Sequence, residues 1–348
     1  MPPAVPAGGL RYRLRGSVDP VRGSDGSLYL VRAGEDDLVI RDPDAEDRLL
    51  LELLASGAEV APDDKLAALI AAGVVVEAAS SEPLDADDAE RYARQLPYLA
   101  EAGDERDLQR RLGAARVTIV GCGGIGTWTV AALASAGVRR LRLVDDDVVE
   151  TSNLNRQVLY GPADVGAAKA ATTARWLRAF DERVEVEIVE RRVDGVDAAA
   201  RVADRADLLV LAADAPPYLL ARWVNEACVA ARVPFIVAGQ LPPLAKVGPL
   251  YWPGRSACFA CHETALRRES ADYDAYVRQL QQAPARGATL GSVSGLVGAS
   301  VAMEVMHALI GITPASLGAA LLVDLRTWDL RREAIARDSE CAACKHLR

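Results

Sequence analysis

The sequence predicts an α/β fold with a mainly parallel sheet, preceded by a small α+β module. Strand and helix patterns alternate from residue 116 onward, and a glycine-rich loop joins the first strand of this series to its helix. Strand–helix–strand units build parallel sheets, because the helix returns the chain to the edge at which the first strand began. A different pattern precedes this series, so we divide the 348-residue chain into residues 1–85 and 86–348.

The first part of the chain, residues 10–78, has short strands followed by two helices. Strands are expected at 10–14, 28–32 and 37–40, between turns that contain Gly and Asp. Leucines at positions 49, 50, 53 and 54 mark the apolar face of a helix that opens at Pro43, and a second helix begins near Pro62. This order resembles a winged-helix-like peptide-binding module, and a purely structural cap on the larger domain is the alternative. The polar residues 79–86 form the expected linker.

The larger domain is expected to be Rossmann-like. Its strands are expected at 116–120, 139–145, 184–189, 208–212, 234–239, 247–252, 321–325 and 327–332. Its helices are expected at 87–96, where Pro97 ends the helix, and at 125–136, 167–179 and 219–231. Residues 289–310 are apolar enough to be mistaken for a membrane span. Because they contain Glu304, His307 and many small residues, we expect a buried core helix instead.

The composition excludes several classes of protein. A net charge of −9 argues against nonspecific nucleic-acid binding, which requires a basic surface. Residues 1–10 have neither the basic nor the apolar region of a secretory signal, so we expect a cytoplasmic protein that binds neither nucleic acid nor a membrane. Four of the six cysteines form two Cys-x-x-Cys pairs, a pattern typical of metal sites rather than of disulfide frameworks.

The loop at residues 121–126, Gly-Cys-Gly-Gly-Ile-Gly, predicts a nucleotide site. Glycines between a strand and a helix let backbone N–H groups approach phosphate oxygens, and the helix N-terminus favours negative charge. The glycines expected under the nucleotide are Gly121, Gly123, Gly124 and Gly126. Asp145 ends the next strand, where a carboxylate can accept hydrogen bonds from ribose hydroxyls.

A polar run, Ser-Asn-Leu-Asn-Arg-Gln at residues 152–157, gives this loop a more specific meaning. A nicotinamide oxidoreductase, which can carry a similar loop, has no obvious use for the run, and the sequence contains no recognisable hydride-transfer site. With Arg-Tyr-Ala-Arg-Gln at 91–95, the run resembles motifs of the ubiquitin-activating-enzyme-like (ThiF-type) adenylyltransferases, over residues 87–348. That family includes sulfur-carrier and microcin C-type peptide adenylyltransferases. Its members use ATP to convert a C-terminal carboxylate to an acyl adenylate, with release of pyrophosphate.

The resemblance implies a role for each polar residue of the site. The implied nucleotide ligands, besides the glycines, are Asp145, Asp147, Asn153 and Gln157. Arg156 and Lys169 would stabilise the phosphates as pyrophosphate leaves, and Asp214 would bind the Mg²⁺ of ATP. Arg94, which alone would be assigned to a surface helix, would reach into the site of a second protomer. We therefore expect a homodimer with shared active sites.

The two Cys-x-x-Cys pairs predict a structural zinc site. Cys258, Cys261, Cys341 and Cys344 would form a closed tetrahedral set of thiolates, which would tie the C-terminal tail to the domain. The other two cysteines, Cys122 and Cys228, are not placed like a thioester nucleophile. Ubiquitin-type enzymes carry such a cysteine in a crossover segment that should correspond to residues 264–288, and this stretch contains none. The resemblance therefore implies an enzyme that only adenylates.

The sequence favours ATP- and Mg²⁺-dependent adenylation of the C-terminal carboxylate of a ribosomal peptide or small protein, in the biosynthesis of a peptide natural product. The extension before residue 86 supports a peptide substrate, because sulfur-carrier enzymes of the family can begin almost directly at the Arg-Tyr-x-Arg-Gln motif. Activation of a ubiquitin-like sulfur carrier for thiamine or molybdopterin is the alternative. A non-catalytic docking scaffold is a third possibility, against which the retained Asp145, Arg156, Lys169 and Asp214 argue.

Overall fold

The computed structural model describes residues 11–32, 36–56, 60, 63–77, 81–241, 243–282 and 288–347. Predictions for the leader 1–9, for Leu10, for Pro62, and for parts of the linker and crossover at 78–80 and 283–287 lie outside the described residues. The chain forms two compact units, Met1–Arg111 and Leu112–Arg348. The predicted boundary after residue 85, which rests on motif content, stays a prediction.

The first unit begins with two small sheets and two helices around one apolar core. Its elements are β1 (Tyr12–Leu14), β2 (Val18–Arg22), β3 (Leu28–Arg32), β4 (Leu38–Ile40), α1 (Ala45–Ser56), α2 (Asp64–Ala71) and β5 (Val75–Glu77). Strands β2, β3 and β4 form an antiparallel meander, and β1 pairs with β5. Helix α2 starts where expected because the Asp63 carboxylate accepts the N–H of Leu66 at 2.6 Å. The expected order of strands and two helices is confirmed, whereas β2 and β5 were not predicted.

The helix expected at 87–96 is confirmed in its first part, as far as Arg91, whereas its continuation to residue 96 and its end at Pro97 are wrong. The chain forms α3 (Ala86–Arg91) and, after a turn, α4 (Leu96–Leu99), and Pro97 lies in the first turn of α4. A proline fits there because the N–H that it lacks would have no partner inside the helix. Helix α5 (Glu105–Ala114), which was not predicted, follows. It contacts the small sheets through an ion pair of 3.2 Å between Arg13 Nη2 and Glu105 Oε2.

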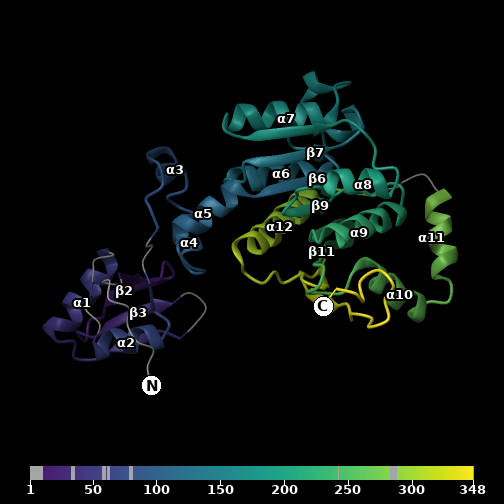
Figure 1. Cartoon of the computed structure of the whole chain (residues 1–348). Helices are drawn as coiled ribbons and strands as arrows, with labels where there is room; N and C mark the ends of the chain where they lie inside the picture. Colours follow the sequence, from purple (N-terminus) through teal and green to yellow (C-terminus); the bar gives the residue numbers. More distant parts are fainter. Residues whose placement is uncertain are drawn as a thin grey trace. The chain divides into compact units, whose positions relative to one another are not determined.

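The second unit is built on an eight-stranded sheet of order β13-β12-β11-β10-β9-β6-β7-β8 (Figure 1). The strands are β6 (Arg116–Val120), β7 (Arg140–Val144), β8 (Glu185–Val189), β9 (Leu208–Leu211), β10 (Phe235–Leu241), β11 (Leu244–Tyr251), β12 (Ala319–Asp324) and β13 (Leu330–Ala334). Five neighbouring strands, in the order β8, β7, β6, β9 and β10, pair in parallel. The remaining pairs, β10 with β11, β11 with β12 and β12 with β13, are antiparallel. The Rossmann-like prediction is confirmed. Strand β13 begins later than expected because the chain turns at Trp328, whose φ is +63°.

Helices cover both faces of this sheet. They are α6 (Gly124–Ser135), α7 (Lys169–Phe180), α8 (Val196–Ala203), α9 (Leu219–Ala231), α10 (Phe259–Glu269), α11 (Tyr273–Gln282) and α12 (Gly291–Ile310). Helices α6 and α12 lie side by side, as do α8 and α9 (Figure 1). Helices α8, α10 and α11 were not predicted.

Helix α12 is long and apolar enough to cross a membrane by length and composition alone, with a mean hydropathy of 1.6. It nevertheless packs against α6 and against strands β10 and β11. A Cβ added at Gly298 would lie 2.6 Å from the Cβ of Trp128, so only glycine permits this close approach of the two helices. Thr129 Oγ1 donates to the Gly298 carbonyl at 3.1 Å. The expected core helix is confirmed.

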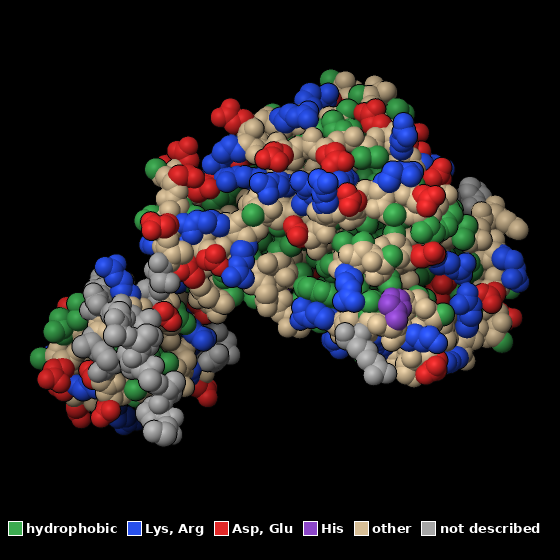
Figure 2. All heavy atoms as spheres, in the orientation of Figure 1, with side chains coloured by type: hydrophobic (Ala, Val, Ile, Leu, Met, Phe, Trp, Pro, Cys, Tyr) green, Lys and Arg blue, Asp and Glu red, His purple; other side chains and the backbone are tan. Residues whose placement is uncertain are grey.

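Basic and acidic side chains are interleaved on the surface of the larger unit. Figure 2 shows a band of Lys and Arg side chains, with Asp and Glu side chains directly beside it. At the sheet edge, Arg142 Nε of β7 lies 2.9 Å from Glu187 of β8, and Arg140 Nε lies 3.6 Å from Glu185. These pairs reduce the field that the arginines would otherwise present to a polyanion. The expectation that the chain binds no nucleic acid stays a prediction.

Candidate nucleotide site and cysteine cluster

A cavity of about 520 Å³ opens at the carboxyl ends of strands β6, β7, β9 and β10. Ligands of open α/β sheets bind at this edge, beside the strand from which the chain continues to one side of the sheet and later returns to the other. Here that strand is β6, which lies between β7 and β9. The predicted residues that line the cavity are Gly121, Gly123, Gly124, Asp145, Asp147, Arg156, Gln157, Lys169 and Asp214. Residues from positions far apart in the sequence therefore meet in one place.

The glycine loop has a backbone that other residues could not adopt. Gly121 has a φ of +99°, and a Cβ there would lie 2.7 Å from the backbone nitrogen of Ala213. A Cβ at Gly126 would lie 1.9 Å from the carbonyl oxygen of Gly121. Gly123 is different, because its added Cβ would meet only Gln157 Nε2, at 3.9 Å. Gly121 and Gly126 are required by the fold, whereas Gly123 keeps the cavity open at the uncapped N-terminus of α6.

This difference gives a matched pair of variants. Gly121→Ala should lower the free energy of unfolding by at least about 2 kcal/mol, because the methyl group meets backbone at a positive φ. Gly123→Ala should unfold at nearly the native temperature, yet bind ATP about tenfold more weakly, because its methyl group occupies space beside the phosphates. Thermal unfolding and calorimetric titration with ATP would measure both effects. Equal loss of stability in the two variants would contradict this account of the loop.

Asp145 holds the glycine loop as well as facing the cavity. Its carboxylate accepts the N–H of Cys122 at 2.6 Å and that of Asp147 at 2.9 Å. Burial raises the pKa of Asp145, while these two hydrogen bonds oppose the rise. Tyr160, a residue that we did not predict, fixes the other side of the loop by donating to the Cys122 carbonyl at 2.8 Å.

Lys169 is positioned by a short backbone pairing. Val148 and Ala168 form an isolated antiparallel bridge, and the Lys169 N–H donates to the Asp147 carbonyl at 2.9 Å. The side chains of the same two residues pair as well, with 2.9 Å between Lys169 Nζ and Asp147 Oδ2. The lysine side chain is 9% exposed and that of the aspartate 59%. Asp147 therefore holds the ammonium group in place at the cavity wall.

The polar run after β7 forms a turn in which some side chains line the cavity and others do not. Arg156 lines the cavity, and its guanidinium donates to the Ser152 carbonyl at 2.8 Å. Gln157 is 3% exposed and lines the cavity, and its Oε1 has no hydrogen-bond partner among the residues that the structure describes. Asn153 is buried outside the cavity wall, and its Oδ1 accepts the Glu150 N–H at 3.1 Å. The contact of Asn153 with a nucleotide therefore stays a prediction that the geometry does not favour.

Asp214 and Arg94 are both exposed. Asp214 follows β9 and contributes a carboxylate to the cavity wall, where oxygen ligands suit Mg²⁺. The carboxylates of Asp145, Asp146 and Asp147 also lie within 4.8 Å of one another. Arg94 lies in the turn between α3 and α4, in the first unit. Its predicted role in a second protomer stays a prediction.

Other polar residues of the cavity were not predicted. Arg191 and Arg192 follow β8, and Arg192 Nε lies 3.2 Å from Asp146 Oδ2. Gln240, Thr289 and Ser294 also line the cavity. The two arginines could have been found by the rule that identified Asp145, since they directly follow a parallel strand. Thr289 and Ser294 have no such signal, because they precede and begin a long apolar helix.

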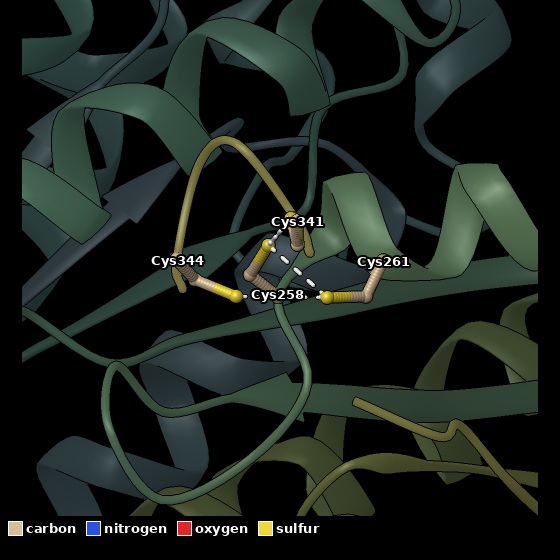
Figure 3. Close-up of side chains that lie close together, drawn as sticks. All are labelled: Cys258, Cys261, Cys341 and Cys344. Atoms are coloured by element: carbon tan, nitrogen blue, oxygen red, sulfur yellow. Dashed lines mark hydrogen bonds between the residues drawn. The ribbon is translucent and has the colours of Figure 1, made fainter. Parts of the chain in front are cut away.

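The four cysteines of the two Cys-x-x-Cys pairs converge, as Figure 3 shows. Cys258 and Cys261 come from the start of α10, and Cys341 and Cys344 from the C-terminal segment. The sulfur separations are 3.8 Å for Cys258 and Cys261, 3.7 Å for Cys258 and Cys341, and 3.5 Å for Cys261 and Cys344. Zn–S bonds of about 2.3 Å in a tetrahedron place sulfurs about 3.8 Å apart. The cluster therefore fits zinc.

The surroundings of the cluster fit a structural role. All four thiols are buried, and the hydrogen bond from Cys258 lowers the pKa of Cys261 while it raises the pKa of Cys258 itself, so the two thiols hold one proton between them. Arg337 Nη2 donates to the Cys344 carbonyl at 2.9 Å. In contrast, burial raises the pKa of Cys122 and raises that of Cys228 to about 12. These last two thiols are therefore poor nucleophiles.

Comparison with known proteins supports the same reading. A protein-family profile described as "ThiF family" matches residues 92–343. The "adenylyltransferase and sulfurtransferase MOCS3" of Bos taurus is 36% identical over 313 residues, which cover 84% of this chain and 64% of that protein. The "sulfur carrier protein adenylyltransferase" of Thermus thermophilus is 32% identical over 269 residues, covering 74% of this chain and 91% of that protein.

Solved structures resemble the whole chain. The crystal structure of E. coli MccB with ATP has a TM-score of 0.72 and 26% identity, and covers 96% of this chain and 99% of MccB. The structure of E. coli MccB with AMPCPP and selenomethionyl MccA has a TM-score of 0.75 at 25% identity, with the same coverage. The first unit thus has a structural counterpart, whereas the chain spans less than two thirds of the bovine protein.

Proposed function

The chain belongs to the ThiF family, and from this premise we propose that it is an adenylyltransferase that uses ATP to activate a C-terminal carboxylate. The observation that carries this proposal is that several functional groups meet in one cavity at the sheet edge. The cavity joins a glycine loop, a carboxylate suited to ribose, several cationic side chains that include Arg156 and Lys169, and a carboxylate suited to Mg²⁺. A docking scaffold would need no such combination of groups.

The residues of the cavity suit each part of the reaction. Asp145 would accept hydrogen bonds from the ribose, and the glycine loop would cradle the phosphates at the N-terminus of α6. A carboxylate oxygen of the substrate would attack the α-phosphorus, the bond from that phosphorus to the bridging oxygen would break, and pyrophosphate would leave. Lys169 and Arg156 would stabilise the negative charge on the departing group. Mg²⁺, when bound with ATP, would neutralise phosphate charge, and Asp214 would hold it.

The substrate that we propose is a ribosomal peptide or small protein. Supporting this choice, the MccB structures cover 96% of the chain, including the first unit, whereas the bovine relative covers 84%. On this proposal the first unit binds the leader part of the peptide, and the C-terminal carboxylate of the same peptide is the group that is activated. The sequence relatives named as adenylyltransferases of sulfur carriers support the alternative, a ubiquitin-like carrier that ends in Gly-Gly.

ATP–pyrophosphate exchange tests the function and distinguishes the substrates. Labelled pyrophosphate should enter ATP only when the correct carboxylate is present, so peptides encoded nearby and a carrier protein would be compared. A matched peptide amidated at its C-terminus is the control, because it has no nucleophilic carboxylate. Absence of exchange with every substrate, together with absence of ATP binding, would overturn the proposal in favour of a docking scaffold.

We propose further that Arg94 acts in the site of a partner protomer. An Arg94→Ala protein and a Lys169→Ala protein should each exchange at about 1% of the native rate or less. Mixed at equal concentrations, they should recover about a quarter of native exchange, because half of the dimers would be mixed and each would contain one complete site. Mixing Arg94→Ala with an Arg94→Ala, Lys169→Ala double variant is the control. Without recovery in the first mixture, Arg94 would not act across protomers.

A further inference from the structure

One wall of the cavity carries a closed hydrogen-bond ring of three uncharged side chains. Thr289 Oγ1 donates to Gln240 Oε1, and Gln240 Nε2 donates to Ser294 Oγ at 2.8 Å. The Ser294 and Thr289 hydroxyl oxygens lie 3.2 Å apart, which closes the ring. The three residues come from the end of β10, the loop before α12, and the first turn of α12. All three line the cavity.

The ring lies against the predicted phosphate site. A Cβ added at Gly124 would be 2.8 Å from Ser294 Oγ, so the serine hydroxyl touches the start of α6. A Cβ at Gly291 would be 2.6 Å from the carbonyl oxygen of Asn155, so α12 begins on the turn that carries Arg156. Ser294 is fully buried. The ring is thus fixed by backbone on two sides, and a group bound to it would be near the phosphates.

The ring leaves one donor unused. Each of its three groups donates one hydrogen bond to the next and accepts one, which holds the Gln240 amide in a single orientation. An amide nitrogen has two hydrogens, and only one goes to Ser294. Among the residues that the structure describes, the second has no acceptor. Gln240 can therefore donate one hydrogen bond to a ligand in the cavity.

The charges of the cavity indicate which ligand this is. Arg156, Lys169, Arg191 and Arg192 line the cavity from the polar turn, α7 and the end of β8, where the phosphates of ATP would find cations. Among the residues that the structure describes, those that line the cavity from β10 and from the segment directly before and at the start of α12 carry no charge. They are Ala238, Gly239, Gln240, Ala288, Thr289 and Ser294. This neutral wall suits the second reactant better than it suits pyrophosphate.

We propose that Gln240 Nε2 binds an oxygen of the substrate's C-terminal carboxylate, and that Thr289 and Ser294 are positioning residues. This inference rests on the proposed adenylation function. A neutral donor orients the carboxylate without the ion pair that would make its oxygen less nucleophilic. One carboxylate oxygen attacks the α-phosphorus and pyrophosphate leaves. The other oxygen becomes the carbonyl oxygen of the acyl adenylate and keeps the hydrogen bond from Gln240.

Two probes separate this contact from nucleotide binding. AMP has no acyl group, whereas N-acetylglycyl-sulfamoyladenosine carries an acyl carbonyl where the adenylate would have it. Calorimetry on the full-length Gln240→Leu protein should give a Kd for AMP near the native value and a Kd for the acyl sulfamate about tenfold higher. Ser294→Ala should shift the same ratio in the same direction by a smaller factor. Ser135→Ala, an exposed serine on α6, is the matched control and should change neither Kd.

The outcomes distinguish failure of the Gln240 contact from failure of the proposed adenylation function. Native AMP affinity in the variants would show that they are folded. If both probes bind the native protein and Gln240→Leu weakens neither, or weakens both equally, the inference is overturned and the adenylation function stands. If the native protein binds neither AMP nor the acyl sulfamate, the proposed function and the inference fall together.

Discussion

Replacing Lys169 by alanine is expected to slow ATP–pyrophosphate exchange by about 10²- to 10³-fold, because a fixed cation at the leaving group is lost. The variant should remain folded. Lys169 Nζ pairs with Asp147 at 2.9 Å, but the aspartate side chain is 59% exposed, so water can solvate the carboxylate left behind. Exchange rates and thermal unfolding, measured on the same preparations, would check both statements.

A second lysine provides the control. Lys65 in α2 also pairs with an aspartate, Asp44, at 2.9 Å, but it lies in the first unit. Lys65→Ala should therefore leave exchange with a short C-terminal substrate within about twofold of native. Equal losses of exchange in the two variants, or native exchange in Lys169→Ala, would contradict the role assigned to Lys169.

Removing the cysteine cluster is expected to produce the largest loss of stability. Cys341→Ser combined with Cys344→Ser should abolish zinc binding and lower the melting temperature by more than about 10 °C, because metal binding adds directly to folding free energy. The C-terminal segment should then become sensitive to protease, since Cys341 and Cys344 hold it to α10. Elemental analysis should give one zinc per native chain and none in the variant.

Cys228→Ser is the matched control for this variant. Cys228 is also a buried thiol, in α9, but it does not belong to the cluster. Its replacement should cost stability through burial of a hydroxyl, while the zinc content stays at one per chain. A native protein that lacks zinc when purified without chelators, and melts at the same temperature as the double variant, would rule out the structural metal.

Much of the larger fold follows from local pattern. Strand β6 and helix α9 have the predicted bounds, because a fully buried strand and a long helix with one apolar face each have a strong period. Helix α5 was missed because its sequence is dominated by charged residues, and α10 because it begins inside a Cys-x-x-Cys pair. Pro97 was misassigned for a different reason, because a proline is compatible both with the residue that follows a helix and with the first turn of the next helix.

From the sequence we could predict only those site residues whose place follows from their position at the end of a strand or in a motif. The glycine loop, Asp145 and Asp214 lie at strand ends, and parallel strands bring their ends together. The pairing of Lys169 with Asp147 depends on a bridge between Val148 and Ala168, which no motif announces. Gln240 and Ser294 meet only because α12 packs between α6 and β10, an arrangement set by tertiary contacts. Long-range packing thus completes a cavity that local motifs begin.

The fate of the carboxylate oxygen tests the central claim most directly. A peptide substrate labelled with ¹⁸O in its C-terminal carboxylate would be incubated with ATP and the native protein. The products would be analysed by mass spectrometry after water has attacked the carbonyl carbon of the adenylate, which breaks its C–O bond and leaves the bridging oxygen on AMP. Attack on the α-phosphorus predicts that one ¹⁸O appears in AMP and none in pyrophosphate. Formation of ADP and phosphate, or AMP without the label, would contradict adenylation of the carboxylate.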